Sequence, residues 1–410
     1  MLEQYVCGPC ALARVLKNPI LEHIERLVAH LHGQGYRPAT IQRYVLVAEH
    51  FGNWLGRRPR RLRIVSRAAV DAFLHRHLPR CSCSTPAPRH DHNIRRALAH
   101  MVPPPPAAPP TPSERLVQKY LHHLDHVCGA APATLFCRGR YAREFLGLQS
   151  ARGARCPSEW TVRHVMQYVL KYFTSGKRST ARSAAYSLRS FLRFLHARGL
   201  CDSRLINAVP RLPLRRRASL PRVMTEEQLR RFLASFDRSD PIGRRDYAMA
   251  LFMVELGLRV GEVVSLELRD IDWRTGTVAV RSSKGRRTRL LPLSARIGSA
   301  TADYIKGGRP VSQDRHVFLR QSPPVGSPVT GPLIKKRICR AYARSGCPAD
   351  WAGTHVLRHT AATRLLHGGA CMKEIADVLG HRSIETSAIY ATVDVAALSA
   401  VALPWPEARP

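Results

Sequence analysis

The sequence lacks any long apolar run. Its longest apolar stretch, "YAMALFMVELGL" at 247–258, contains Glu255 and is shorter than the roughly 20 residues that a membrane-spanning helix needs. We therefore interpret this stretch as a buried core helix. The first residues, "MLEQYVCGPCALARVL", also lack the basic start and long apolar run of a signal peptide. Together these absences lead us to expect a cytoplasmic protein.

Acidic residues are scarce as well. Only 29 Asp and Glu oppose 65 Lys and Arg in the 410 residues, so the formal net charge is +36. A folded chain with this excess of positive charge repels itself, and a polyanionic partner relieves the repulsion. Nucleic acid is the first candidate partner and a membrane surface is the second. The hydrophobic content of 45% is typical of a globular protein, and the length predicts several domains.

The 11 cysteines are odd in number and scattered along the chain. With no secretory signal, we expect them to be reduced thiols. The "CGPC" run at 7–10 resembles a redox motif, but that motif needs a preceding strand, and only six residues precede this one. A zinc site in residues 1–101 is conceivable, but the ligand spacings are irregular, so we leave it open and predict no metal. Its candidate ligands are Cys7, Cys10, Cys81, Cys83, His90 and His92.

Two proline-rich stretches divide the chain. "VPPPPAAPPTP" is typical of a stiff, extended linker. "NAVPRLPLRRRASLPRV" alternates proline with arginine, which suits a strap along a phosphate backbone, although a solvated linker with incidental charge is the alternative. The predicted parts are an N-terminal helical domain (1–101), a proline-rich linker (102–112), a helical domain (113–206), a basic linker (207–223), a further domain (224–394) and a C-terminal tail (395–410).

Residues 113–200 show helical periodicity, with Ser113 as the expected first N-cap. "RSTARSAAYSLRSFLRFLHARGL" places leucines and phenylalanines on one face and arginines on another, and Gly199 is expected to end that helix. Residues 24–101 weakly echo this pattern, which suggests a duplicated helical domain; chance similarity between amphipathic helices is the alternative. The role of this domain is left open between a second DNA-binding domain and a protein-contact module. The arginines expected to contact a polyanion are Arg182, Arg189, Arg193, Arg215, Arg216, Arg217, Arg286 and Arg287.

From residue 224 the pattern changes. Thr225 followed by Gln228 predicts a capping box at a helix start. Alternating runs at 277–281 and 288–293 surround a basic turn at 283–287, which predicts a hairpin or small antiparallel sheet. Helices are expected to follow to the end. The predicted fold class is therefore mainly α with a small antiparallel β-sheet, and the C-terminal domain is mixed α+β.

The C-terminal half also holds a set of polar residues that are hard to explain as structure alone. An arginine follows the buried helix at a glycine corner in "ELGLRVGEVVSL". In "GTHVLRHTAATRLL", Thr354 is an expected N-cap, and the histidine and arginine behind it are three apart on one helix face. In "VLGHRSIETSAIY", a histidine follows a Leu-Gly corner and a tyrosine lies on the next helix. With the lysine of the hairpin tip, the set is Arg259, Lys284, His355, Arg358, His381 and Tyr390.

Such a set suits phosphodiester chemistry without a metal. Arginine forks bind non-bridging phosphate oxygens, a tyrosine hydroxyl with a pKa near 10 needs a base and positive surroundings to attack, and a mobile lysine can protonate the leaving oxygen. The sequence lacks a GxxxxGK[ST] phosphate loop, so we expect no ATP and no cofactor. His355 and His359 are spaced like a zinc pair, but Val356 stands where the metalloprotease motif needs Glu, so we expect no metal there either.

The stretches "GLRVGE", "SSKGRRTRLLPL", "HVLRHTAATRLL" and "VLGHRSIETSAIY" together resemble the catalytic domain of the tyrosine recombinases, the phage integrase family. The resemblance covers roughly 225–394. It implies that Arg259 and Arg358 clamp the scissile phosphate, that Lys284 is the general acid, and that His355 acts as acid and base on Tyr390. It also implies that His381 donates a further hydrogen bond to the phosphate, and that Glu262 supports the site from behind.

The resemblance also implies the architecture and partners. A helical core-binding domain and the catalytic domain would clamp duplex DNA, and four protomers would assemble on two DNA sites, as monomers or dimers off DNA, with the tail at 395–410 exchanged between protomers. Accessory DNA-bending proteins or a partner recombinase are further expected partners. The expected function is site-specific recombination through a 3′-phosphotyrosine, serving a mobile element. The alternatives are a chromosome-dimer or plasmid resolvase, a type IB topoisomerase, a non-catalytic architectural DNA-binding protein, and a basic protein that binds RNA or a membrane surface.

Overall fold

The computed structural model describes residues 1–59, 63–83, 91–102, 109–154, 156–175, 178–211, 221–281, 288–351 and 353–381. The chain divides into two compact units, one of Met1–Pro104 with Leu220–Pro410 and one of Pro105–Ser219. In the described ranges, helices dominate and one small antiparallel sheet is present, which confirms the predicted fold class. No helix in these ranges has both the length and the apolar composition to cross a membrane. The finer domain boundaries stay a prediction.

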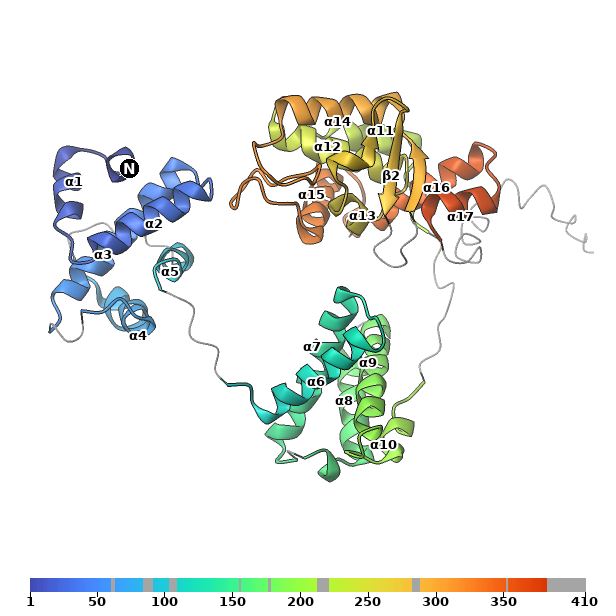
Figure 1. Ribbon diagram of the computed structural model, residues 1–410, viewed down its shortest axis with the longest axis horizontal. Coiled ribbons are helices and arrows are strands. Elements are labelled where there is room, and N and C mark those ends of the chain that lie inside the picture. The colour runs from blue at the N-terminus through green and yellow to red at the C-terminus, as the bar shows by residue number, and fades with distance from the viewer. Residues whose placement is uncertain are drawn as a thin grey trace, which may run out of the picture. The chain divides into compact units, whose positions relative to one another are not determined.

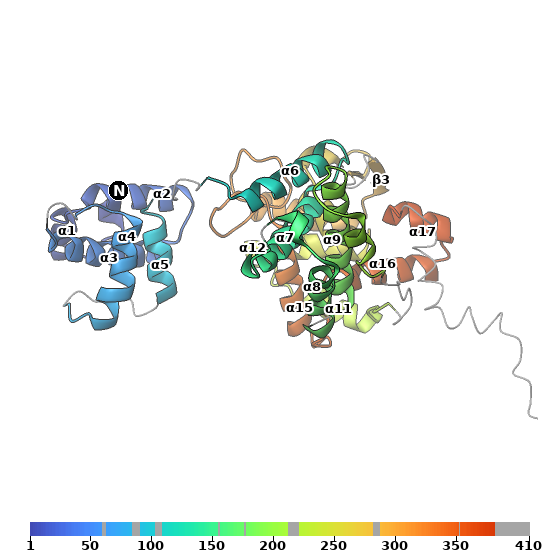
Figure 2. The same ribbon diagram turned by 90° about the horizontal axis from the view of Figure 1, so that it is seen from below.

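A small helical domain forms around a core of N-terminal residues. Ile24 and Leu31 of α2 and Ile41 and Phe51 of α3 are fully buried, because apolar residues recur at helical spacing on both helices. Helix α3 packs against α2 and α5 (Figure 2). The elements are η1 (Leu2–Gln4), α1 (Pro9–Leu16), α2 (Leu21–Gly33), α3 (Pro38–Gly56), α4 (Arg67–Ala72), η3 (Phe73–His77), η4 (Leu78–Arg80) and α5 (Asp91–Ala99).

The second unit is a helical bundle (Figure 1). Its elements are α6 (Pro112–His126), α7 (Pro132–Ala151), η5 (Pro157–Glu159), α8 (Val162–Ser175), α9 (Arg178–His196) and α10 (Ser203–Asn207). The predicted apolar stripe of α9 is confirmed, since Leu188, Phe191, Leu192 and Leu195 are all at most 1% exposed. Past the end of α9, Gly199 adopts φ +68°, a conformation that favours glycine.

The predicted N-cap of the first helix in this bundle is wrong. Helix α6 begins at Pro112, and the hydroxyl of Thr111, not that of Ser113, accepts a hydrogen bond from the backbone N–H of Glu114 at 3.1 Å. Proline suits the first position of a helix, because its φ is already helical and its nitrogen has no hydrogen to satisfy. The cap therefore moves to the residue that precedes the proline.

The third core belongs to the C-terminal part of the chain. Thr225 and Gln228 form the predicted capping box, with hydrogen bonds of 3.1 and 3.0 Å. The apolar stretch that follows is the predicted core helix, α12, which packs against α14, α15 and α16. The elements are α11 (Glu226–Ala234), α12 (Pro241–Val254), α13 (Val260–Val264), η6 (Leu268–Asp270), α14 (Ala295–Gly307), α15 (Gly331–Arg344), α16 (His355–His367) and α17 (Met372–Leu379).

A three-stranded antiparallel sheet in the order β1-β2-β3 lies beside these helices, and the predicted hairpin is its β2-β3 pair. The strands are β1 (Ile271–Asp272), β2 (Thr277–Arg281) and β3 (Thr288–Pro292). Val278 and Val280 turn toward the core, and they pair with Leu291 and Arg289 respectively. Arg289 therefore projects from the same face of the sheet as the buried valines, toward α17, which packs on β3.

Candidate active site

Arg259 and Glu262 form one end of the site, at the start of α13. Gly257 adopts φ +62° and turns the chain so that Arg259 becomes the N-cap residue. The backbone N–H of Arg259 donates to the Glu262 carboxylate at 2.8 Å, and its Nη1 donates to the same carboxylate at 3.0 Å. Glu262 is 3% exposed, whereas the side chain of Arg259 is 41% exposed. The buried carboxylate thus orients an arginine whose outer side remains open.

Arg289 is a second partner of this carboxylate, although in the sequence it is one of several arginines in a basic run and was not among the predicted site residues. Its Nη1 and Nη2 donate to the two oxygens of Glu262 at 3.0 and 2.9 Å, and its Nε donates to the carbonyl of Val378 at 2.9 Å. Burial of the Glu262 carboxyl opposes its ionisation, but the hydrogen bonds from Arg289 and from the Arg259 backbone, with both positive charges, outweigh burial and hold its pKa below the usual value. The residue is therefore a carboxylate at neutral pH.

Arg358 enters the site from α16, where it is only 6% exposed. Its Nη1 donates to the carbonyl of Gly257 at 2.5 Å and its Nη2 to the carbonyl of Leu379 at 2.6 Å. Arg259 reaches the same corner, with Nη1 3.3 Å from the carbonyl oxygen of Leu379 and Nη2 3.2 Å from that of Gly380. The two arginines expected to clamp one phosphate thus meet at the end of α17.

Two glycines allow this close approach. Gly380 is the left-handed C-cap of α17, at φ +62°, and a Cβ there would lie 2.8 Å from Nη1 of Arg289. A Cβ on Gly257 would lie 2.3 Å from the Leu379 side chain. Only glycine satisfies both the backbone conformation and the space at these corners. Both glycines are visible in the sequence, in "GLR" and "LGH", but only the structure shows that side chains packed against them leave no room for a Cβ.

His381 follows this corner, and its backbone N–H donates to the carbonyl of Ala376 at 2.8 Å. Burial, followed by the positive charges of Arg358 and Arg259, lowers the pKa of His381 from 6.5 to about 4. Burial lowers the pKa of His359 to about 4 in the same way, with His355 and Arg358 contributing. His381 is therefore neutral at pH 7, with one ring nitrogen that donates and one that accepts.

The remaining predicted residues are less close or lie outside the described residues. His355 is exposed at the first position of α16, with its ring centroid 6.4 Å from that of His359. Thr354 is the N-cap residue as predicted, although its side chain makes no capping hydrogen bond with the described residues. The residues outside the described ranges are Lys284, Tyr390, Arg215, Arg216, Arg217, Arg286 and Arg287. The structure therefore brings together Arg259, Arg358 and His381.

The arginines predicted on α9 differ in their surroundings. Arg182 and Arg193 are exposed. Arg189 is half-buried, and its Nη2 donates to the carbonyls of Val209 and Pro210 at 2.7 and 3.0 Å. Its guanidinium thus anchors the chain that leaves the bundle, and its contact with DNA stays a prediction, as do those of the other two.

The site as a whole suits an anion. The guanidinium groups of Arg259 and Arg289 share a single carboxylate, and Arg358 adds a third positive charge at the end of α17. The site therefore has an excess of positive charge, and the neutral imidazole of His381 can donate one hydrogen bond. Donors fixed in advance around a developing negative charge are the usual way in which proteins stabilise a phosphoryl transition state. In the part of the chain that the structure describes, the only group with metal-ligand geometry lies in the N-terminal domain and contains neither His355 nor His359.

Comparison with known proteins gives consistent matches. The profile of the phage integrase family matches residues 222–396. A Sinorhizobium fredii protein named as an integrase/recombinase, y4rA, is 34% identical over 412 residues, covering 99% of each chain. The tyrosine recombinase XerD of Xanthomonas campestris is 31% identical over 76% of this chain and 95% of its own length. In fold, the chain is similar to the site-specific recombinase XerH, in a crystal structure of its post-cleavage complex with palindromic difH substrate. The TM-score is 0.54, and the sequences are 20% identical over 73% of this chain and 98% of that chain.

Proposed function

We propose that this chain recombines specific duplex DNA sites through a covalent bond between Tyr390 and the DNA. The chain belongs to the phage integrase family of tyrosine recombinases, and it is therefore an enzyme that breaks and rejoins DNA strands. The observation that carries the proposal is the convergence of Arg259 and Arg358 on one corner, beside a neutral His381. This arrangement suits the cleavage of a phosphodiester, because two guanidinium groups and one neutral imidazole donor can bind and polarise a phosphate without a metal ion.

In the proposed cleavage step, the hydroxyl oxygen of Tyr390 attacks the scissile phosphorus. A 3′-phosphotyrosine bond forms and the bond to the 5′-oxygen breaks. The phenolic proton passes to His355, and Lys284 protonates the departing 5′-oxygen. Attack by a 5′-hydroxyl from the partner duplex then reverses each step and releases the tyrosine. Bond energy is conserved in the intermediate, so the proposed reaction needs neither ATP nor a metal.

The arginines have separate parts in this proposal. Arg358, held by two carbonyls and almost fully buried, provides a rigid fork, whereas Arg259 is 41% exposed and faces the incoming DNA. Glu262 and Arg289 touch no substrate in this scheme; they position Arg259 and the end of α17. His381 donates its single hydrogen to a non-bridging oxygen.

We further propose the partners and biological role. The DNA duplex is bound by the helical domain, through Arg182 and Arg193 among others, and by the catalytic domain, and four protomers act on two sites with exchange of residues 395–410. We also propose that the protein acts in the cytoplasm and that accessory DNA-bending proteins take part in the reaction. The proposed role is integration of a mobile element. The match to y4rA, which is named as an integrase/recombinase, covers 99% of the chain, N-terminal domain included, and it supports the integration part of this role.

The test uses duplexes from the flanks of the protein's own gene, some with a nick that traps the cleaved strand. Wild type and Tyr390→Phe are incubated with them in EDTA, and denaturing gels report protein joined covalently to DNA. We expect an adduct with wild type and none with Tyr390→Phe. The matched control is Tyr36→Phe, which removes a tyrosine hydroxyl from the N-terminal domain and should leave the adduct unchanged.

Three other outcomes would redirect the proposal. An adduct that persists in Tyr390→Phe would assign the nucleophile to another residue. Specific, tight binding without any adduct would favour an architectural DNA-binding protein. Relaxation of supercoiled DNA without exchange between two duplexes would favour a topoisomerase. Sequencing of the trapped duplex identifies the DNA site in the expected case.

A further inference from the structure

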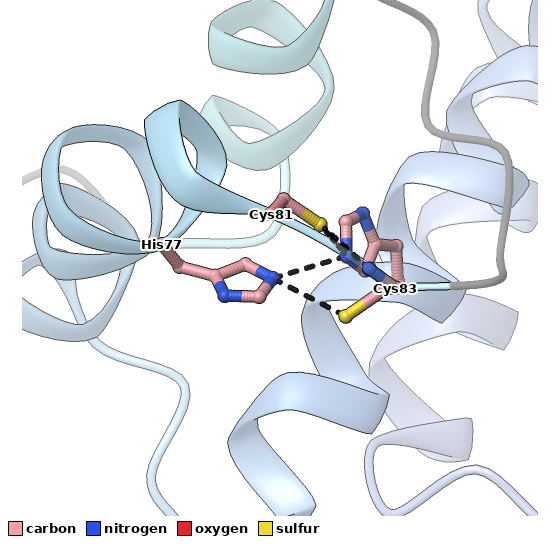
Figure 3. A group of neighbouring side chains, drawn as sticks. His77, Cys81 and Cys83 are labelled. Carbon is pink, nitrogen blue, oxygen red and sulfur yellow. Dashed lines mark hydrogen bonds between the residues drawn. The ribbon is translucent and has the colours of Figure 1, made fainter.

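The N-terminal domain contains a cluster of nitrogen and sulfur atoms that the recombination chemistry does not use. One ligand atom from each of His50, His77, Cys81 and Cys83 lies within 4.8 Å of all the others. Figure 3 shows the side chains of His77, Cys81 and Cys83 turned toward a common centre. Of the four candidate ligands from the sequence whose side chains the structure describes, Cys81 and Cys83 belong to the cluster, whereas Cys7 and Cys10 are exposed and outside it. The side chains of His90 and His92 lie outside the described residues.

Three separate elements deliver these four side chains. His50 comes from the middle of α3 and is 1% exposed. His77 is the last residue of η3, a π-helical turn that continues α4. The two cysteines follow η4, and the backbone N–H of Cys83 donates to Sγ of Cys81 at 3.4 Å, so the chain turns around that sulfur. Such local turns let two cysteines two residues apart face one point.

Three distances between ligand atoms of the cluster are close to those of a tetrahedron around a zinc ion, and all the others are within 4.8 Å. With Zn–N near 2.05 Å and Zn–S near 2.3 Å, tetrahedral geometry separates two nitrogens by about 3.3 Å and a nitrogen from a sulfur by about 3.6 Å. The two Nε2 atoms of His50 and His77 are 3.1 Å apart. Sγ of Cys81 lies 3.4 Å from Nε2 of His50, and Sγ of Cys83 lies 3.7 Å from Nε2 of His77.

Hydrogen bonds alone do not satisfy this cluster. Nε2 of His50 faces both Nε2 of His77 and Sγ of Cys81, yet a neutral imidazole nitrogen either donates once or accepts along one lone pair. A central cation accepts all four lone pairs at once, which removes the conflict at Nε2.

The surroundings are those of a closed, structural site. The ring of Phe73 packs edge-on to His50 and stacks on His77, with centroids 5.2 Å apart in each case, and Trp54 lies 5.7 Å from His77. These rings fix the orientation of the imidazoles, and of the four ligand residues His50 is buried and the other three are half-buried. Nη1 of Arg57 lies 3.9 Å from Sγ of Cys83, so an outer positive charge supports a thiolate.

We propose that His50, His77, Cys81 and Cys83 bind one structural Zn²⁺ ion that ties α3 to the η3–η4 segment. Two imidazoles and two thiolates in a tetrahedron are a ligand set that zinc prefers, and four protein ligands leave no position for substrate. Two thiolates also neutralise the ion. Because the unfolded chain cannot present these four atoms together, zinc binding contributes directly to folding of the N-terminal domain.

The first test uses the wild-type full-length chain, purified with a reductant and without added chelator. Elemental analysis is expected to find about one zinc per chain. Cys81 and Cys83 are expected to resist alkylation until a strong chelator is added, and then to react at least about tenfold faster, as located by peptide mass spectrometry. The exposed Cys7 and Cys10 are the internal controls and should react at one rate with or without chelator.

The second test compares variants and a spectroscopic probe. The double variant Cys81→Ser/Cys83→Ser is expected to lose zinc, whereas the matched Cys7→Ser/Cys10→Ser is expected to retain it. Replacing the zinc of the wild type with Co²⁺ should give the visible bands of tetrahedral cobalt and thiolate charge-transfer absorption. The cobalt spectrum of the wild type keeps the test valid even where the double variant does not fold.

The proposal is overturned by a zinc-free wild-type chain, by equal alkylation of Cys81 and Cys83 with and without chelator, or by a disulfide between them. It does not depend on the proposed function. Covalent attachment to DNA is read from Tyr390 in a separate assay, so a zinc site without cleavage, or cleavage without zinc, would contradict one proposal and leave the other standing.

Discussion

Arg259 and Arg358 donate hydrogen bonds to the same acceptor, the backbone carbonyl oxygen of Leu379, at 3.3 and 2.6 Å. Arg259 is the N-cap residue of α13 and Arg358 lies on α16, so a single carbonyl at the end of α17 sets the spacing between two guanidinium groups that are far apart in the sequence. A third arginine, Arg289, holds the carbonyl of the preceding residue, Val378. The geometry of the phosphate site therefore depends on the backbone of α17 as much as on the arginines themselves.

Replacing Arg358 by lysine should abolish most activity. Lysine has no planar fork and cannot reach the carbonyls of Gly257 and Leu379 together while still offering donors to a phosphate. We expect the rate of covalent DNA cleavage by Arg358→Lys to fall on the order of 10²-fold or more. The control is Arg364→Lys on the same helix, where an exposed arginine pairs with Glu226 and should be tolerated. Wild-type cleavage by Arg358→Lys would contradict the assigned role.

Replacing Glu262 by glutamine should destabilise the catalytic domain. The carboxylate is 3% exposed and neutralises both Arg259 and Arg289, so the change leaves two guanidinium groups without a counter-charge. Breaking a buried ion pair in this way costs about 3–5 kcal/mol of unfolding free energy. Glu227→Gln, an exposed partner of Arg231, should cost less than about 1 kcal/mol. Urea unfolding of both variants measures the difference, and equal losses would show that Glu262 is not the central counter-charge.

Because the pKa of His381 is lowered, we expect the folded protein to lose stability in mild acid. This pKa is lowered from 6.5 to about 4 in the folded protein, so between these values the unfolded chain binds a proton that the folded chain does not. The contribution of a neutral His381 to stability is therefore fully present above pH 6.5 and is lost as the pH falls toward 4. In His381→Gln, the dependence of unfolding free energy on pH should be flatter across this window.

Urea midpoints measured at several pH values between 7 and 4 test this expectation. The control is His367→Gln, which changes an exposed histidine at the end of the same catalytic domain's α16 and should keep the wild-type slope. Some slope should remain in His381→Gln, because the pKa of His359 is also lowered to about 4. An unchanged slope in His381→Gln would mean that its imidazole is not shielded from protonation in the folded state.

Alanine substitutions at two glycines with the same backbone φ distinguish the cost of backbone strain from the cost of crowding by a new Cβ. Gly276 and Gly380 both adopt φ +62°, but a Cβ on Gly276 meets nothing within 4 Å, whereas one on Gly380 would meet Nη1 of Arg289 at 2.8 Å. Gly276→Ala should therefore cost only the left-handed strain of about 1–2 kcal/mol. Gly380→Ala should lose more stability than this and should also slow DNA cleavage, because Arg289 and the end of α17 must shift. Equal effects would show that the crowding is relieved at no cost.

The sequence determined the local structure of this protein and the chemistry that its residues can perform. Apolar periodicity identified the buried face of α9, alternation identified the β2-β3 hairpin, and the spacing of Thr225 and Gln228 identified a capping box at a helix start. These are short-range properties, because the side chains involved are neighbours on one element, and its period alone places them. The error at Ser113 was of the same kind, a cap displaced by two residues before a proline.

Tertiary structure alone decided which distant residues meet. Arg259 reaches the carbonyl of Gly380 across 121 residues, and Arg289, which in the sequence is one more charge in a basic run, becomes the second partner of Glu262. Likewise, the sequence showed cysteines at 81 and 83, but only packing of α3 against η3 supplied His50 and His77 to complete four ligands. No periodicity encodes such contacts, because they depend on how several elements bury their apolar faces together and on glycines that let two backbones approach.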